Sequence, residues 1–131
     1  MTQSLAQRLQ IRPKSRGAVI NAPSGMLELY DPLPEGVTLS MELGDSLDFV
    51  HLFVRNRAEL EQFGPAVLAA VQGDKLLWIS YPKRSAKLET DLTRDAGWEL
   101  LDAAGLRGVR QISIDEVWSA LRFRPREAVG K

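Results

Sequence analysis

The chain has 131 residues, of which 44% are hydrophobic and 26% are charged, so it has the composition of a folded protein with room for one domain. Lys plus Arg number 17 and so do Asp plus Glu, so no net charge draws the whole molecule toward nucleic acid or an anionic membrane. There is no cysteine, which excludes disulfides, zinc ribbons and thiol catalysis.

Basic residues gather at the two ends of the chain. Residues 1–17 contain Arg8, Arg12, Lys14 and Arg16 and no acid, and residues 118–131 are also basic. We interpret these ends as solvated and mobile; an acidic partner is the alternative, and nucleic acid is not expected. The N-terminal stretch lacks the apolar core of a signal peptide and no run is long enough to span a membrane, so we expect a soluble cytoplasmic protein without a membrane partner.

The first half of the chain predicts short elements separated by proline and glycine. Leu5 and Leu9 are four residues apart, as on one face of a short helix, and Pro23 and Gly25 interrupt the chain after the first strand. The expected elements are a helix at 3–10, a strand at 18–21, a short helix at 26–30, and strands at 37–42 and 46–54.

The second half predicts two helices and three more strands. Asn56 is a suitable N-cap for a helix that Pro65 should kink or divide, and Thr90 or Asp91 should cap a second helix that runs to Gly105. The apolar run that begins at Leu76 is typical of a central strand. Two final strands are expected at 109–114 and 118–123, and the link between them is too short for a parallel crossover, so they should be antiparallel.

Strands that alternate with helices predict a single α/β domain over residues 1–131: a mainly parallel, Rossmann-like sheet of about six strands with helices on both faces and a C-terminal antiparallel strand. Residues 1–16 would form the N-terminal helix and a basic link, and residues 125–131 a flexible tail. Whether the last strand inserts beside the fourth strand or stays at the edge is open.

Ligands of such sheets lie outside the carboxyl ends of the parallel strands, which selects the candidate site residues. They are Asn21, Glu42, Tyr81, Lys83, Trp118 and Ser119. Lys83 is the main candidate, because a lysine in a crevice can hold a phosphate or carboxylate; the alternative is a loop lysine paired with Asp91 or Glu89.

Three other features favour structural roles. The bond between Tyr81 and Pro82 is expected to be trans. His51 is the only histidine and lies inside a strand between two phenylalanines, so we expect a hydrogen-bonded core residue and no metal site. Arg122 and Arg124 share one face of the last strand with Trp118, and we expect them to find acidic partners; an anion or partner-protein site is the second interpretation.

Most of the chain resembles a family of small uncharacterised bacterial proteins that are classed only as a domain of unknown function. The matching segments are AVINAPSG, DFVHLFVRNRAEL, LLWISYPKRS, TDLTRD and DEVWSALRFRPR. This resemblance implies no activity.

The element order also resembles a trimmed class I methyltransferase that depends on S-adenosylmethionine. That resemblance implies a glycine-rich loop after the first strand, where the backbone approaches the cofactor, but the segment NAPSG at residues 21–25 keeps only Gly25. Glu42 stands where the fold would place a ribose-binding carboxylate. We therefore expect a degenerate member of this fold and no cofactor.

Two functional hypotheses follow. The first is a non-catalytic domain that binds a small anionic ligand or a protein partner at the carboxyl edge of the sheet. The second is a nucleotide- or anion-binding enzyme in which Tyr81 and Trp118 stack on a base and Lys83, with Asn21, holds its phosphate. A third, in which the basic ends bind nucleic acid, requires steep salt dependence.

Overall fold

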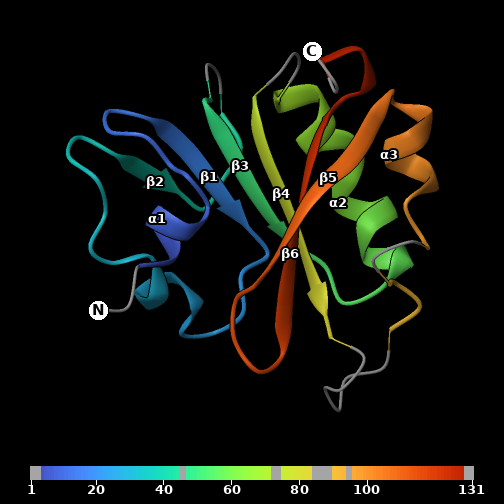
Figure 1. The fold of residues 1–131 in the computed structure, drawn as a ribbon, viewed down its shortest axis with the longest axis horizontal. Helices are drawn as coiled ribbons and strands as arrows, with labels where there is room; N and C mark the ends of the chain where they lie inside the picture. Colours follow the sequence, from blue (N-terminus) through green and yellow to red (C-terminus); the bar gives the residue numbers. More distant parts are fainter. Residues whose placement is uncertain (1–3, 45–46, 72–74, 84–89, 94–95, 129–131) are drawn as a thin grey trace.

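The computed structural model describes residues 4–44, 47–71, 75–83, 90–93 and 96–128, which form one sheet of six strands in the order β2-β1-β3-β4-β6-β5 (Figure 1). The strands are β1 (Arg16–Ile20), β2 (Thr38–Ser40), β3 (Phe49–Phe53), β4 (Leu76–Pro82), β5 (Leu106–Ser113) and β6 (Trp118–Pro125). The helices are α1 (Leu5–Arg8), α2 (Arg57–Ala70) and α3 (Glu99–Ala103), with 3₁₀ turns η1 (Met26–Tyr30) and η2 (Arg126–Ala128). No helix of this part of the chain is long and apolar enough to cross a membrane.

The first four strands are parallel and the last strand reverses. β1 pairs in parallel with β2 and β3, and β3 pairs in parallel with β4. β6 lies between β4 and β5 and is antiparallel to both. The predicted α/β sheet with a C-terminal antiparallel strand is therefore confirmed, and the last strand inserts beside the fourth instead of staying at the edge.

One face of the sheet packs against α2 and α3, at the right of Figure 1. Asn56 begins α2 as predicted, because its side chain accepts a hydrogen bond from the Glu59 backbone N–H. Leu60 and Val67 of α2 are buried on this face. Pro65 lies inside α2 without dividing it, so of the two predicted effects, a kink or a second piece of helix, the second does not occur.

The opposite face is covered by α1 and η1, which confirms helical cover on both sides of the sheet. Leu5 and Leu9 are buried there, as their spacing predicted, and so is Tyr30. The indole N–H of Trp78 in β4 donates to the Leu9 carbonyl at 3.0 Å, which fixes the end of α1 over the centre of the sheet.

The prediction of a long helix from Thr90 to Gly105 is wrong. Only Glu99–Ala103 is helical, because Gly97 has a φ of 100° and the chain turns there. The Thr90 hydroxyl accepts from the Leu92 N–H across a turn and does not cap a helix. Residues 94–95 lie outside the described part of the chain, so the segment before the turn is defined only up to residue 93.

Both ends of the described chain are hydrogen-bonded to other parts of the domain. After α1, the Ile11 N–H donates to the Ala6 carbonyl at 3.0 Å and the Lys14 N–H donates to the Glu35 carbonyl at 2.7 Å. At the other end, β6 extends to Pro125 and the Arg126 N–H donates to the Gly105 carbonyl at 2.9 Å. The last strand is therefore two residues longer than the predicted strand, which ended at residue 123.

Candidate functional site

The topology brings the carboxyl ends of β1, β3, β4 and β5 to one edge of the sheet, where β6 begins. Pro82 at the end of β4 is opposite Trp118 at the start of β6, and the Lys83 N–H donates to the Val117 carbonyl at 2.7 Å. The peptide bond before Pro82 is not cis, as expected. The backbones of Lys83, Trp118 and Ser119 thus lie close together at this edge of the sheet, although Lys83 is far from the other two in the sequence.

At the β1 end of this edge, Asn21 closes the space between two strands. Its φ is 60°, a left-handed conformation that asparagine tolerates better than most residues. The side-chain amide donates to the Phe53 carbonyl at the end of β3 at 2.8 Å and lies 3.4 Å from Glu59 Oε1. Asn21 therefore links β1 to β3 and to the first turn of α2.

Glu59 and Arg55 complete this polar cluster. Glu59 Oε2 and Arg55 Nη2 are 2.6 Å apart, and Glu59 Oε1 accepts the Arg55 backbone N–H at 2.8 Å. The hydrogen bonds from Arg55 lower the pKa of Glu59 and the same contact raises the pKa of Arg55. The Glu59 carboxylate at this end of β1 and β3 is therefore already bonded by the chain itself.

Glu42, the candidate ribose-binding carboxylate, lies beyond the end of β2 and is exposed. Its backbone N–H donates to Ser40 Oγ at 3.1 Å. β2 is the outer strand next to β1, so Glu42 has the position along the fold that the methyltransferase resemblance implies.

Lys83 lies at the opposite end of the same edge, just past β4. Its Nζ donates a hydrogen bond of 2.5 Å to Ser113 Oγ, and Ser113 is the last residue of β5. Lys83 makes no ion pair with any residue of the described segments, and Asp91 instead accepts the Arg57 backbone N–H. Glu89, the other suggested partner, lies outside the described residues. The ammonium group is held by a neutral hydroxyl, which leaves two of its three hydrogens for other acceptors.

Tyr81 and Trp118 lie in different cores, on opposite faces of the sheet. Tyr81 packs on the α2 side, contacts Trp98 edge-on and donates to Gln111 Oε1 at 2.6 Å. Trp118 packs on the α1 side against Phe53. Both are buried, at 4% and 7% exposure, so the hypothesis that the two rings stack on one base is wrong. Ser119 is cross-strand from Tyr81 and is also buried.

His51 is a hydrogen-bonded core residue, as predicted. Its Nδ1 contacts the Tyr30 hydroxyl and its Nε2 is 2.5 Å from Ser80 Oγ. Burial lowers the pKa of His51 from 6.5 to about 3 and raises the pKa of Tyr30. No group of three or more potential metal-ligating side chains occurs in the described segments.

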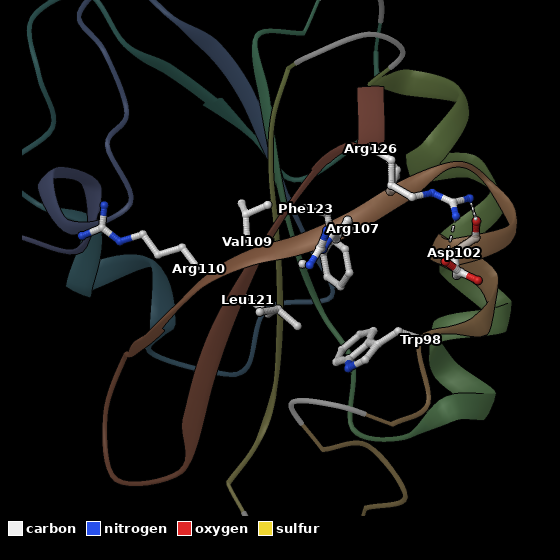
Figure 2. A pocket seen from close by; sticks show the side chains of 10 residues that line it. Trp98, Asp102, Arg107, Val109, Arg110, Leu121, Phe123 and Arg126 are labelled. Carbon is white, nitrogen blue, oxygen red and sulfur yellow. Dashed lines mark hydrogen bonds and ion pairs between the residues drawn. The ribbon is translucent and has the colours of Figure 1, made fainter. Parts of the chain in front are cut away.

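A half-open pocket of about 560 Å³ lies between α3 and the outer strand β5 (Figure 2). Its lining includes Trp98, Leu121 and Phe123 and the arginines of β5 and η2, and in Figure 2 the Arg110 side chain extends away from the others. Arg126 pairs with Asp102 across one side, with Nη1 and Oδ1 3.6 Å apart. This pocket contains none of the predicted site residues and lies away from the carboxyl edge.

Four side chains that bond the predicted residues were not selected from the sequence. One of them is Ser113, although it lies near the end of the strand predicted at 109–114. Tyr30 and Ser80 carry no sequence signal for their contacts with His51, because one is in a 3₁₀ turn and the other in a neighbouring strand. Glu59 had a signal, since Asn56 followed by glutamate three residues later is a helix-start pattern.

No protein-family model and no curated protein sequence matches the chain. Similar solved structures include magnesium protoporphyrin IX methyltransferase from Synechocystis with bound S-adenosylmethionine, at 11% identity and a TM-score of 0.56 over 92% of this chain and 74% of that one. TrmN from Thermus thermophilus is 10% identical, with a TM-score of 0.53 over 92% and 48% of the two chains. A protein of the NADB-Rossmann superfamily from Streptococcus agalactiae is 12% identical, with a TM-score of 0.51 over 95% and 70%.

At these identities the likeness concerns the fold, which is Rossmann-like and methyltransferase-like. The residues after β1 do not fit S-adenosylmethionine. The Asn21 amide is bonded to the Phe53 carbonyl, Pro23 has no amide hydrogen to offer, and the five-residue turn η1 follows where a long helix would present its N-terminus. We therefore assign no chemical step to that cofactor.

Proposed function

We propose that this chain is a non-catalytic binding domain with a methyltransferase-like fold, and that it holds a small anionic ligand at the carboxyl edge of β4 and β5. The observation that carries the proposal is the position of Lys83. Lys83 is half-exposed, and its ammonium group is bonded to Ser113 Oγ and forms no ion pair in the described segments. A phosphate or carboxylate there would form a charge-assisted hydrogen bond.

Two features support a binding role over a catalytic one. The carboxylate at the carboxyl end of β1 and β3, Glu59, is held by Arg55 and Asn21 and has a lowered pKa, so it is a poor general base. The one histidine is buried at 1% exposure, and burial keeps it neutral. Among the described residues, the candidate site thus contains a binding group and no paired acid and base.

Thermal unfolding of the wild type with inorganic phosphate, citrate, a sugar phosphate and S-adenosylmethionine tests the proposal. We expect at least one of the first three to raise the melting temperature, because a ligand that binds only the folded state stabilises it. The shift should disappear in Lys83→Met and return in Lys83→Arg, while Ser113→Ala should reduce it.

The alternatives separate in the same assay. Stabilisation by S-adenosylmethionine would contradict the non-catalytic assignment and require a methyl-transfer assay. Stabilisation that persists in Lys83→Met would move the ligand elsewhere. If no anion stabilises the protein, the small-ligand proposal fails, and the edge would have to be tested as a protein-binding surface with Lys83→Met as the matched variant.

A further inference from the structure

The amino ends of β1, β3 and β4 border a second, larger pocket of about 930 Å³. It lies at the edge of the sheet opposite to the carboxyl edge, where Lys83 is located. Its size falls in the range of small-molecule pockets, roughly 300 to 1,000 Å³. Of the charged residues known to line it, five are basic and one is acidic; they are Arg12, Lys14, Lys75, Arg122, Arg124 and Asp48.

The fold assembles this pocket from both ends of the chain. Trp78 bonds to the Leu9 carbonyl, so the link that follows α1 crosses the sheet beside β6. Arg122 Nη1 then donates to Gln10 Oε1 at 3.3 Å, which joins the N-terminal link to the last strand. The two basic clusters that are remote in the sequence are therefore neighbours in space.

Three of the basic side chains that line this pocket have no ion pair within the described segments. Arg12, Lys14 and Lys75 are exposed and form no ion pair in the described segments. The acidic residue of the lining, Asp48, directs its carboxylate to the backbone, where Oδ2 accepts the Arg16 N–H at 2.8 Å. Such a site attracts a ligand that carries several negative charges.

The backbone at Lys14 is a second, independent indication. Lys14 has a φ of 63°, and it follows Pro13 in a turn closed by the Ser15 N–H and the Arg12 carbonyl at 3.3 Å. Proline followed by a positive φ is the arrangement of a type II turn, whose third position favours glycine or asparagine. A lysine there is strained, and strained residues gather at functional sites. Lys14 is one of the residues that line the pocket.

The apolar part of the lining offers little surface, because Ile11 and Phe49 are buried, at 5% and 2% exposure, and only Leu76 is half-buried. The basic side chains therefore decide which ligand the pocket suits. Arginine and lysine together are the usual ligands of phosphate oxygens. We propose that this pocket binds a small polyphosphorylated molecule.

Isothermal titration calorimetry of the full chain at low ionic strength tests this, with tripolyphosphate and ATP as probes and adenosine as the uncharged comparison. We expect both charged probes to bind and adenosine not to bind. Arg12→Gln with Lys14→Gly should weaken binding by about tenfold or more, because two charge-assisted contacts are lost. Arg107→Gln with Arg110→Gln removes the same charge from β5 and should leave the affinity unchanged.

Other results would overturn the proposal. Failure of the wild type to bind tripolyphosphate and ATP would do so, as would equal losses in the two double variants, which would indicate an effect of overall charge. Binding of a single-stranded RNA oligonucleotide by a protein that ignores tripolyphosphate would replace the small ligand with nucleic acid. Thermal unfolding of each variant separates loss of the fold from loss of the site.

Discussion

The two ends of the parallel strands differ in how their charges are balanced. At the carboxyl end of β1, Asn21, Arg55 and Glu59 bond to one another and to the backbone. At the amino end, Arg12 and Lys14 line an open pocket without ion pairs in the described segments. The end at which this fold class normally binds its cofactor is closed beside β1, and the opposite end is open and basic.

This difference shows that the topology and the side chains give separate information. The sheet order identifies the edge where related folds hold ligands. Whether a particular strand end is available depends on which polar groups the chain bonds internally, and of the described cations at that edge Lys83 is bonded to a hydroxyl and Arg55 to a carboxylate. Four changes test how firmly the two ends are defined.

The largest effect is expected at Gly17, near the amino end of β1. A Cβ at this position would lie 2.1 Å from Phe49 Cζ, and the Phe49 ring is buried and lines the basic pocket. Gly17→Val should therefore lower the free energy of unfolding by about 3 kcal/mol through overpacking. Urea unfolding followed by tryptophan fluorescence measures this loss.

Gly44→Val is the matched control, because nothing lies within 4 Å of a Cβ there and its φ is not positive. It should change the free energy of unfolding by less than about 0.5 kcal/mol. Equal effects of the two substitutions would mean that Phe49 does not rest on Gly17, and the amino end would then be less well defined than described.

His51 lies in the middle of β3, between the two ends of the strand, and should make the stability of the whole domain sensitive to acid. In the folded protein its pKa is about 3, whereas the unfolded chain takes up the proton near 6.5. The free energy of unfolding therefore includes the full contribution of the neutral imidazole above about pH 6.5, and this contribution is lost as the pH falls toward 3. Between pH 7 and 5 the loss should be about 2 kcal/mol.

Urea unfolding at several pH values in this range measures the slope. His51→Gln is expected to be less stable at pH 7 but to lose much less between pH 7 and 5. The same slope in wild type and variant would assign the acid sensitivity to other groups. Glu59 is not expected to be one of them, because its pKa is lowered in the folded protein and the stability it contributes is lost only below the ordinary pKa of 4.5.

Asn21 tests the closure of the carboxyl end. Asn21→Ala removes the bond to the Phe53 carbonyl and places alanine at a φ of 60°, so the free energy of unfolding should fall by about 1 to 2 kcal/mol. Asn21→Gly tolerates the conformation and should lose about half as much. Chemical unfolding distinguishes the two, and if both variants matched the wild type, the amide would be available for a ligand.

Much of the fold was predictable because it depends on local patterns. Apolar runs located the strands, and the short link before Trp118 predicted the antiparallel pair. The length of the helix before Gly105 was overestimated, because leucines at helical spacing also occur in turns. Nothing local to Gly97 separates a positive φ from a helical one; the Leu92 side chain, whose Cδ2 would be 2.5 Å from a Cβ there, lies five residues away in the chain.

The site was predictable only as an edge. Strand ends placed Lys83 and Trp118 as neighbours, but the face of each side chain depends on register, which separated Tyr81 from Trp118. The basic pocket was not predicted, because Arg12 and Arg124 are more than a hundred residues apart and meet only through the insertion of β6 beside β4.

The smallest effect, of opposite sign, is expected at Lys14. Lys14→Gly removes the strain of a lysine at a φ of 63°, about 1 kcal/mol, while glycine also adds freedom to the unfolded chain. The net change should be between no effect and a stabilisation of about 1 kcal/mol. Arg12→Gly removes an equal charge from the same pocket at a residue whose φ is not positive, so it should instead destabilise by up to about 1 kcal/mol. Opposite signs in urea unfolding would mean that the lysine is retained at the amino end despite its backbone cost, whereas two equal losses would remove strain as an argument for that site.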